Sequence, residues 1–163
     1  MSGALLTVEE AIVRFAREKR NGSVVFTAGC FDLLHPGHIR MLEEARSLGD
    51  ALLVGIAGDA GVQRMRGPAR PLIPGRERAE LMAALECVDA VVIFDESALQ
   101  SLIAKILPDV LVWDGKDEEN LIAGQSEVEA AGGRVVRISA LAAYSNNEIL
   151  RRVREMAGSP SQH

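Results

Sequence analysis

Cysteine is scarce in this sequence of 163 residues: only Cys30 and Cys87 occur, and their separation matches no metal-binding spacing. Positive charge is also in deficit, with 18 lysines and arginines against 23 aspartates and glutamates. The resulting net charge of −5 argues against a nucleic acid or an anionic membrane as the main partner. The first ten residues lack the basic region of a secretory signal, and no run approaches the roughly 20 apolar residues of a membrane span. We therefore expect a soluble, cytoplasmic protein with reduced thiols.

The composition is that of one globular domain, with 48% hydrophobic and 25% charged residues. A capping box from Thr7 to Glu10 predicts a lead-in helix within residues 1–22 that ends near Arg20, and we expect one domain over 1–157. The small and polar residues of 158–163 predict a disordered tail.

Apolar runs alternate with segments of helical periodicity along the rest of the chain. The expected strands are 24–27, 51–57, 90–94, 110–113 and 134–138. This alternation predicts an α/β fold, a Rossmann-like doubly wound five-stranded parallel sheet. We expect the strand order 3-2-1-4-5, with the switch point beside the first strand.

Two histidines mark the turn after the first strand, in the sequence His35-Pro36-Gly37-His38. Proline favours the first helical position, so His35 becomes the cap and both rings can lie on one side of the first turn. Gly37 leaves room for a ligand near the backbone, and the free N–H groups of a helix start favour an anion. The pattern indicates binding of phosphate oxygens.

This motif resembles the HxGH signature of the cytidylyltransferase-like nucleotidyltransferase superfamily. The resemblance runs from about residue 7 to 155 and is strongest to the adenylyltransferase domain of the bifunctional ADP-heptose synthases. It implies that His35 and His38 are catalytic. It also implies a nucleotide-binding set, which consists of Gly29, Cys30, Phe31, Asp32 and Gly37.

Further nucleotide-binding residues follow from the same resemblance. Arg78 matches the arginine that follows the Pro-rich segment in the family, and Arg64 and Arg66 stand where the family has basic residues facing the phosphates. Ser145 and Asn146 precede the last expected helix, where the family usually has S-T-T. There we expect Ser145 and Asn146, with Arg78 and Arg64, to bind phosphates, although a plain helix cap is the alternative for the first two.

The segment after the fourth strand departs from the family. The heptose enzymes of the family typically have the sequence V-K-G-G-D-Y where this chain has V-W-D-G-K-D. We therefore expect the specificity for the base or the acceptor to depend on Trp113, Asp114, Gly115 and Lys116. Trp113 could stack on a base or could belong to the core.

The resemblance implies transfer of a nucleotidyl group, AMP from ATP, to a sugar 1-phosphate such as heptose 1-phosphate, with Mg²⁺ bound to the triphosphate and pyrophosphate released. It also implies a homodimer and a separate sugar kinase as a working partner; metal ligands are not predicted. Cytidylyl transfer from CTP to glycerol 3-phosphate is one alternative. Two others are a nucleotide-binding module without turnover and a structural subunit whose partner carries out the kinase step.

Overall fold

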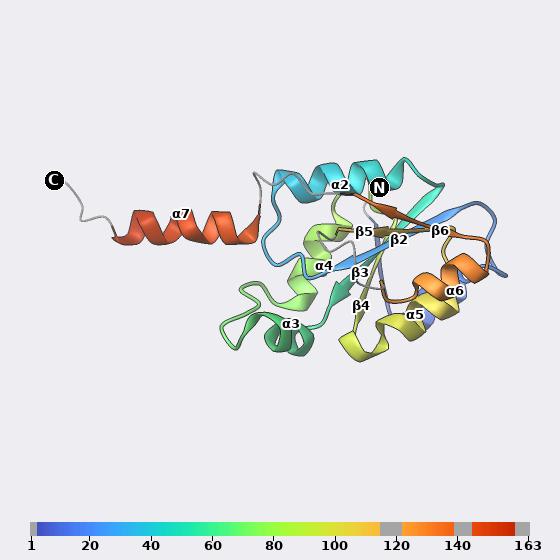
Figure 1. Cartoon of the computed structure of the whole chain (residues 1–163), viewed down its shortest axis with the longest axis horizontal. Helices are drawn as coiled ribbons and strands as arrows, with labels where there is room; N and C mark the ends of the chain where they lie inside the picture. The colour runs from blue at the N-terminus through green and yellow to red at the C-terminus, as the bar shows by residue number, and fades with distance from the viewer. Residues whose placement is uncertain (1–2, 115–121, 139–144, 159–163) are drawn as a thin grey trace.

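The computed structural model describes residues 3–114, 122–138 and 145–158. Parallel strands form a six-stranded sheet in the order β1-β4-β3-β2-β5-β6 (Figure 1). The strands are β1 (Ala4–Leu6), β2 (Val24–Gly29), β3 (Ala51–Ala57), β4 (Ala90–Phe94), β5 (Val110–Trp113) and β6 (Arg134–Arg137). The helices are α1 (Val8–Phe15), α2 (Pro36–Arg46), α3 (Asp59–Arg66), α4 (Gly75–Ala83), α5 (Leu99–Ile106), α6 (Gln125–Ala130) and α7 (Asn146–Gly158), and a 3₁₀ turn, η1 (Glu96–Ala98), precedes α5.

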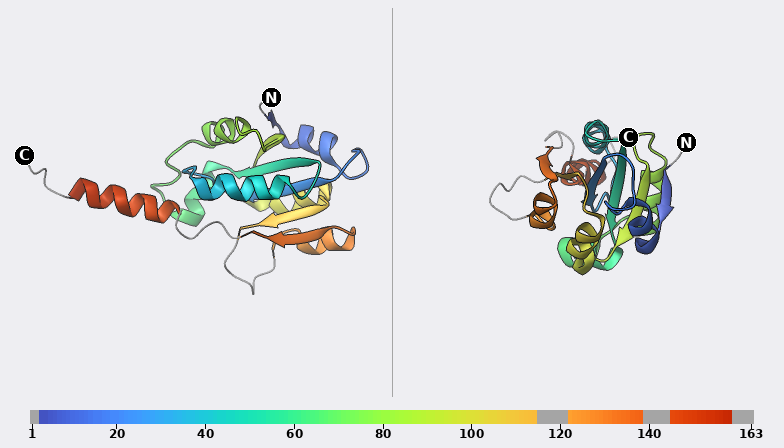
Figure 2. Two further views of the ribbon diagram at one scale, coloured as in Figure 1. Left: turned by 90° about the horizontal axis from the view of Figure 1, so that it is seen from above. Right: turned by 90° about the vertical axis from the view of Figure 1, so that its right-hand side faces the viewer.

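Helices cover both faces of the sheet (Figure 2). Side chains of α1, α5 and α6 pack with Phe26 and Leu53 on one face, and those of α2 and α4 pack with Val25 and Leu52 on the other. Successive residues of a strand point to opposite faces, so interior strands covered on both sides must be apolar throughout. The nearly continuous apolar runs of β2 and β3, in which Thr27 is the one polar side chain, therefore follow from their place in the middle of the sheet.

The predicted α/β fold is confirmed, and the five expected strands lie in the expected order. A sixth strand, β1, was not predicted and extends the sheet beyond β4, with Ala4 opposite Ala90. It has only three residues and Leu5 is 43% exposed, so the segment lacks the apolar run that identifies the other strands.

The lead-in helix has the predicted capping box but is shorter than expected, ending at Phe15 rather than near Arg20. The Arg17 N–H donates to the carbonyl of Ile106 instead of continuing the helix. A contact with α5, which is remote in sequence, therefore sets the end of α1. At the other end of the chain Gly158 closes α7, and the rest of the predicted tail lies outside the described residues.

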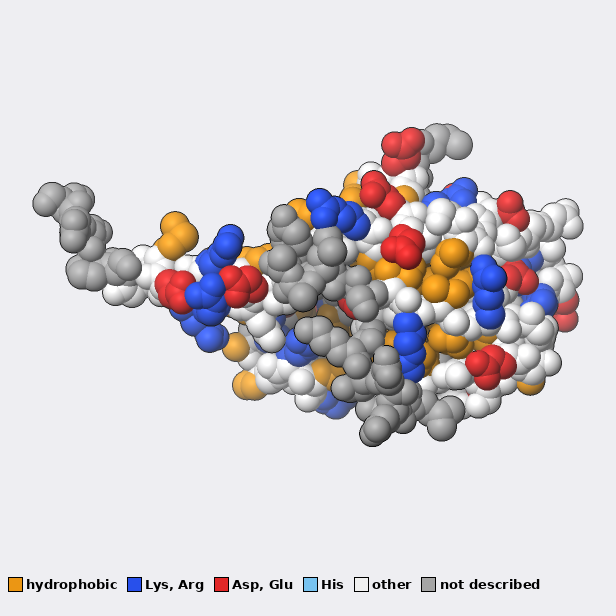
Figure 3. Space-filling view, turned by 45° about the horizontal axis from the view of Figure 1, so that its top comes forward, with side chains coloured by type: hydrophobic (Ala, Val, Ile, Leu, Met, Phe, Trp, Pro, Cys, Tyr) orange, Lys and Arg blue, Asp and Glu red, His pale blue; other side chains and the backbone are white. Residues whose placement is uncertain are grey.

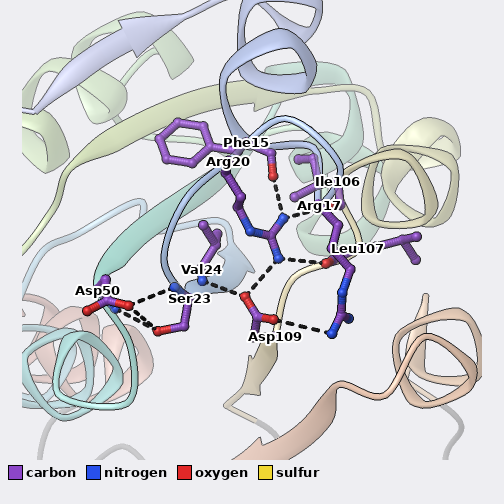
Figure 4. A network of polar contacts seen from close by, with 9 residues as sticks. All are labelled: Phe15, Arg17, Arg20, Ser23, Val24, Asp50, Ile106, Leu107 and Asp109. Carbon is purple, nitrogen blue, oxygen red and sulfur yellow. Dashed lines mark hydrogen bonds and ion pairs between the residues drawn. The ribbon is translucent and has the colours of Figure 1, made fainter.

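A polar network joins the amino ends of β2 and β5 (Figure 4). The Asp109 carboxylate accepts from the Val24 N–H at 2.7 Å and from the Arg20 guanidinium at 2.8 Å. Arg20 also donates to the carbonyls at the ends of both neighbouring helices, those of Phe15, Ile106 and Leu107. The network fixes the two strands that flank the switch point, at the end of the sheet away from the histidines. None of the described helices is long and apolar enough to cross a membrane.

Candidate active site

A cavity of about 140 Å³ opens where β2 ends and the chain turns towards α2. It lies beside β5, at the switch point of the doubly wound sheet, where ligands of such folds bind. Its lining consists of Ala28, Gly29, Cys30, Phe31, His38, Met41, Arg66, Asp114 and Asn146. Seven of these residues, all except Ala28 and Met41, belong to the set that the sequence indicates, and they come from four separate parts of the chain.

The two histidines stack at the start of α2. His35 is the N-cap, Pro36 is the first helical residue, and the His35 Nδ1 accepts a long hydrogen bond of 3.4 Å from the His38 N–H. The ring centroids are 3.7 Å apart, with 21° between the ring planes. Because Nδ1 is the acceptor, a neutral His35 carries its proton on Nε2.

Burial keeps both rings neutral at neutral pH. It lowers the pKa of His38 to about 4, with His35 acting in the same direction and the backbone of Leu33 opposing it. Burial also lowers the pKa of His35, while the carboxylate of Asp114 acts to raise it. Of the two rings, His38 lines the cavity, and a neutral imidazole offers a ligand a single N–H donor. An incoming anion would favour its protonation.

A strained turn supports the His38 ring from behind. Phe31 has a left-handed backbone, with φ +47°, and its buried ring meets the His38 ring edge to face at 5.2 Å. A Cβ on Gly29 would stand only 2.9 Å from Cε2 of Phe31, so the strand must end in glycine for this ring to fit. Gly37 is buried in the first turn of α2. Gly29 and Phe31 thus set the position of the histidine pair.

Asp32 faces into the protein rather than into the cavity. It is 2% exposed, and its carboxylate accepts from the Arg70 guanidinium at 2.7 Å and from the N–H groups of Leu72 and Ile73 at 2.8 and 3.0 Å. The carboxylate therefore ties the turn after β2 to the irregular segment 67–74.

Arg78, on α4, also joins the turn after β2 to the segment 67–74. Its side chain has no exposed surface and donates to the carbonyls of Cys30 at 2.5 Å and Ile73 at 2.9 Å, and to the Asp59 carboxylate at 2.7 Å. This guanidinium lies behind the cavity wall and holds the backbone that forms it.

Arg66, rather than Arg64, lines the cavity. Arg64 forms ion pairs with Asp95 and Glu96 at 3.5 and 3.6 Å and is not among the lining residues. The Cys30 thiol interacts with Arg66, yet burial raises its pKa despite the nearby guanidinium groups. A protonated thiol is a poor nucleophile, which agrees with a backbone role for Cys30.

The start of α7 closes another side of the cavity. The Ser145 side chain accepts from the Glu148 N–H at 3.1 Å as a helix cap, and Asn146 lines the cavity. Over the described residues, three buried side-chain polar atoms lack a hydrogen-bond partner, and two of them, His38 Nδ1 and Asn146 Oδ1, belong to cavity-lining residues. Unpaired buried polar atoms are costly, so the pair points to a polar ligand.

The residues at and after the end of β5 have different surroundings: one packs against the core and the next lines the cavity. Trp113 is half-buried and packs against the apolar cluster shared with α1 and α5, whereas Asp114 is exposed and lines the cavity. Gly115 and Lys116 lie outside the described residues.

Sequence reasoning missed the residues that support the cavity from behind. Asp59 received no role, and Arg70 was considered only as one of several arginines that could complement a triphosphate, not as a partner of Asp32. Met41, which lines the cavity, was not singled out. No local signal distinguishes them, because each acts through a partner that is remote in sequence.

Comparison with known proteins gives a consistent result. A family model described as cytidylyltransferase-like matches residues 26–150. Bifunctional protein HldE of Syntrophotalea carbinolica is 47% identical over 137 residues, which cover 83% of this chain and 28% of that protein. Bifunctional protein HldE of Pelobacter propionicus is 44% identical over 145 residues, covering 89% and 30%. The chain thus spans less than a third of the length of these relatives.

Among solved structures, the lipopolysaccharide core biosynthesis protein of Thermoplasma volcanium superimposes with a TM-score of 0.64 and 29% identity. The match covers 74% of this chain and 99% of that one. The similarity therefore extends over nearly the whole of a solved domain.

Proposed function

The chain belongs to the cytidylyltransferase-like family of nucleotidyltransferases, and from this premise we propose that it transfers AMP from ATP to a sugar 1-phosphate, with heptose 1-phosphate as the first candidate. An oxygen of the acceptor phosphate attacks the α-phosphorus in line as the bond to the β-phosphate oxygen breaks. The products are an ADP-sugar and pyrophosphate, and no covalent enzyme intermediate is needed. Catalysis of this kind depends on positioning and charge stabilisation.

The stacked histidine pair beside the cavity is the observation that carries the proposal. His35 and His38 would donate N–H groups to the triphosphate and to the charge that develops on the α-phosphoryl group. Arg66 would neutralise phosphate charge on the cavity wall, and Asn146 would contact the ligand with its amide group. Asp32 and Arg78 are positioning residues in this scheme, because their polar atoms hold the surrounding backbone.

Mg²⁺ would enter with the triphosphate. Over the described residues, no group of three or more His, Cys, Asp or Glu side chains could hold a metal alone. Mg²⁺ typically binds through one or two carboxylates together with substrate phosphates, and Asp114 contributes one carboxylate to the cavity lining. The donor set therefore fits a metal that is delivered by the nucleotide, where the ion would neutralise phosphate charge.

Pyrophosphate release tests the proposal directly. The purified chain is incubated with ATP or CTP and a panel of sugar 1-phosphates and glycerol 3-phosphate. We expect release with ATP and a sugar 1-phosphate. Saturable nucleotide binding with no release under any pair would identify a binding module instead.

The variant His38→Ala tests whether the histidine pair takes part in catalysis. We expect an unchanged far-UV spectrum and a turnover lower by at least about 100-fold, the scale of losing one transition-state donor. His163→Ala, which alters the only other histidine besides the pair, is the control and should retain full activity. A near-normal rate for His38→Ala would remove this residue from the mechanism.

A further inference from the structure

The stacked histidine pair lies between two concave sites. His38 lines the cavity of about 140 Å³ at the end of β2, and His35 does not. His35 lines a groove of about 430 Å³ on the exposed side of α2 and the turn before it, and His38 does not. Because the ring centroids are 3.7 Å apart, a ligand in the cavity and a ligand in the groove would meet at the pair.

The cavity is too small for two substrates. Sites for small molecules typically have volumes of roughly 300–1,000 Å³, a range that the groove reaches and the cavity does not. Transfer of a phosphoryl group brings the acceptor in line with the leaving group, so the two lie on opposite sides of the phosphorus. The groove on α2 offers room for the second substrate on the His35 side of the pair.

The groove combines apolar and charged side chains. Leu34, Pro36 and Ile39 form its apolar wall, and Arg40 and Glu43 are exposed along it. Figure 3 shows the side of the molecule that carries α2, where hydrophobic side chains are exposed among acidic and basic ones. A guanidinium group binds phosphate oxygens, a carboxylate accepts hydrogen bonds from hydroxyl groups, and apolar side chains can cover the C–H groups of a sugar ring. The groove therefore suits a ligand with all three features, a sugar phosphate.

We propose that the groove on α2 binds the acceptor of the reaction, with its phosphate at the His35 end and its sugar along Ile39 towards Glu43. Glu43 lies two helical turns after Pro36, about 10 Å along the helix axis. An oxygen of the acceptor phosphate would form its bond to the α-phosphorus at the pair, and the bond to the bridging oxygen of the pyrophosphate would break on the His38 side. This assignment rests on the proposed nucleotidyl transfer and names the residues that select its acceptor.

Arg40 and Glu43 would divide the recognition between them. Arg40 follows Pro36 by one helical turn, so its long side chain can reach a phosphate held at the start of α2. The acceptor phosphate and the triphosphate are both anions, and the positive charge of Arg40 would offset their repulsion. Glu43 would accept hydrogen bonds from the sugar hydroxyls, and its negative charge disfavours a second phosphate on the sugar.

Steady-state kinetics of Arg40→Gln test the phosphate contact, with the sugar 1-phosphate that gives the fastest pyrophosphate release. We expect the KM for this acceptor to rise about 10-fold or more, the scale of losing a hydrogen bond to a charged group, and the KM for ATP to change by less than about twofold. Arg76→Gln, which alters an arginine that is 83% exposed on α4, is the control and should change neither KM. An unchanged KM for the acceptor, or a KM for ATP that rises as much, would overturn the assignment.

Glu43 and Glu44 provide a matched pair for the sugar contact, because both are exposed on α2 and only Glu43 lines the groove. Glu43→Gln should raise the KM for the acceptor about threefold or more and narrow the preference for mannose 1-phosphate over mannose 1,6-bisphosphate. Glu44→Gln should leave both quantities unchanged. Equal effects of the two substitutions would show a general effect of charge and refute the hydroxyl contact.

Direct binding separates a wrong groove from a wrong reaction. Amide chemical shifts of the wild-type chain are followed with an ATP analogue that has a methylene group between the α- and β-phosphates. Mannose 1-phosphate, mannose or inorganic phosphate is then added. We expect saturable shifts along residues 34–43 with mannose 1-phosphate, weaker binding of mannose and of phosphate, and an affinity about 10-fold or more lower in Arg40→Gln.

The two kinds of failure give different results. Binding in the groove without pyrophosphate release from any substrate pair would refute the proposed transfer and retain the sugar phosphate site. Pyrophosphate release with an unchanged acceptor KM in Arg40→Gln would refute the site and retain the transfer. The absence of shifts along residues 34–43, or inorganic phosphate that binds there as tightly as mannose 1-phosphate, would also refute the site.

Discussion

Replacing Arg78 by methionine distinguishes a positioning arginine from a phosphate ligand. The side chain is fully buried and donates to two carbonyls and one carboxylate. A carbonyl that loses its donor inside the protein costs about 1–3 kcal/mol. The Asp59 side chain is 47% exposed and can turn to water, so its contribution is small. For the two carbonyls together, we therefore expect Arg78→Met to lower the free energy of unfolding by about 2–6 kcal/mol.

Urea unfolding of the nucleotide-free protein measures this loss, and steady-state kinetics with ATP measure its consequence. The wall of the cavity loses its support, so kcat should fall along with stability. Arg78→Lys keeps the charge but loses the planar fork, and it should lie between wild type and Arg78→Met in both measurements.

Arg76→Met is the control on the same helix. The Arg76 side chain is 83% exposed and forms a surface ion pair with Glu80, so its loss should change stability by less than about 1 kcal/mol. If Arg78→Met matched this control in stability while raising the KM for ATP, the arginine would have to leave its buried position to bind phosphates. That result would refute the positioning role.

Two further predictions concern the scaffold. Although burial acts to raise the pKa of Asp109, hydrogen bonds from Val24 and Arg20 outweigh it and hold the pKa below its ordinary value. The stability from this carboxylate is therefore present above the unfolded pKa of about 3.9 and is lost as pH falls through the lower folded value. Asp109→Asn should flatten the acid limb of thermal melts recorded against pH, and an unchanged limb would contradict the network's role. Gly124→Ala should lower the free energy of unfolding in urea more than Gly67→Ala does. Both glycines have a positive φ, but only at Gly124 would a Cβ overlap a side chain, that of Ile103. Equal losses of stability in the two variants would leave backbone strain as the sole cause.

The main strands could be predicted because a strand covered on both faces must be apolar at every position. β3 satisfies that rule over its whole length and β2 does so except at Thr27, so their existence and order follow from sequence. β1 and the end of α1 could not be predicted, because a pairing with β4 and a hydrogen bond to Ile106 define them. Such partners are more than 80 residues away along the chain and leave no local pattern.

The candidate site likewise has features that the local sequence predicts and features that it does not. The cap at His35 and the stacked rings result from interactions within four residues, which sequence spacing predicts. Arg64 and Arg66 are two positions apart on a helix and so point about 200° apart, which resemblance alone could not resolve. The burial of Arg78 was likewise hidden, because an arginine beside a phosphate site has the same sequence context whether it faces the ligand or supports the loop from behind.

The two histidines must differ in their response to a bound triphosphate. Stacked imidazoles 3.7 Å apart cannot both take a proton at low cost, because two like charges at that distance repel. His38 starts from a pKa of about 4, and burial and its neighbour both oppose its charging. Burial also lowers the pKa of His35, but there the Asp114 carboxylate acts in the opposite direction. We therefore expect proton uptake on nucleotide binding to fall on His35, with His38 remaining a neutral donor.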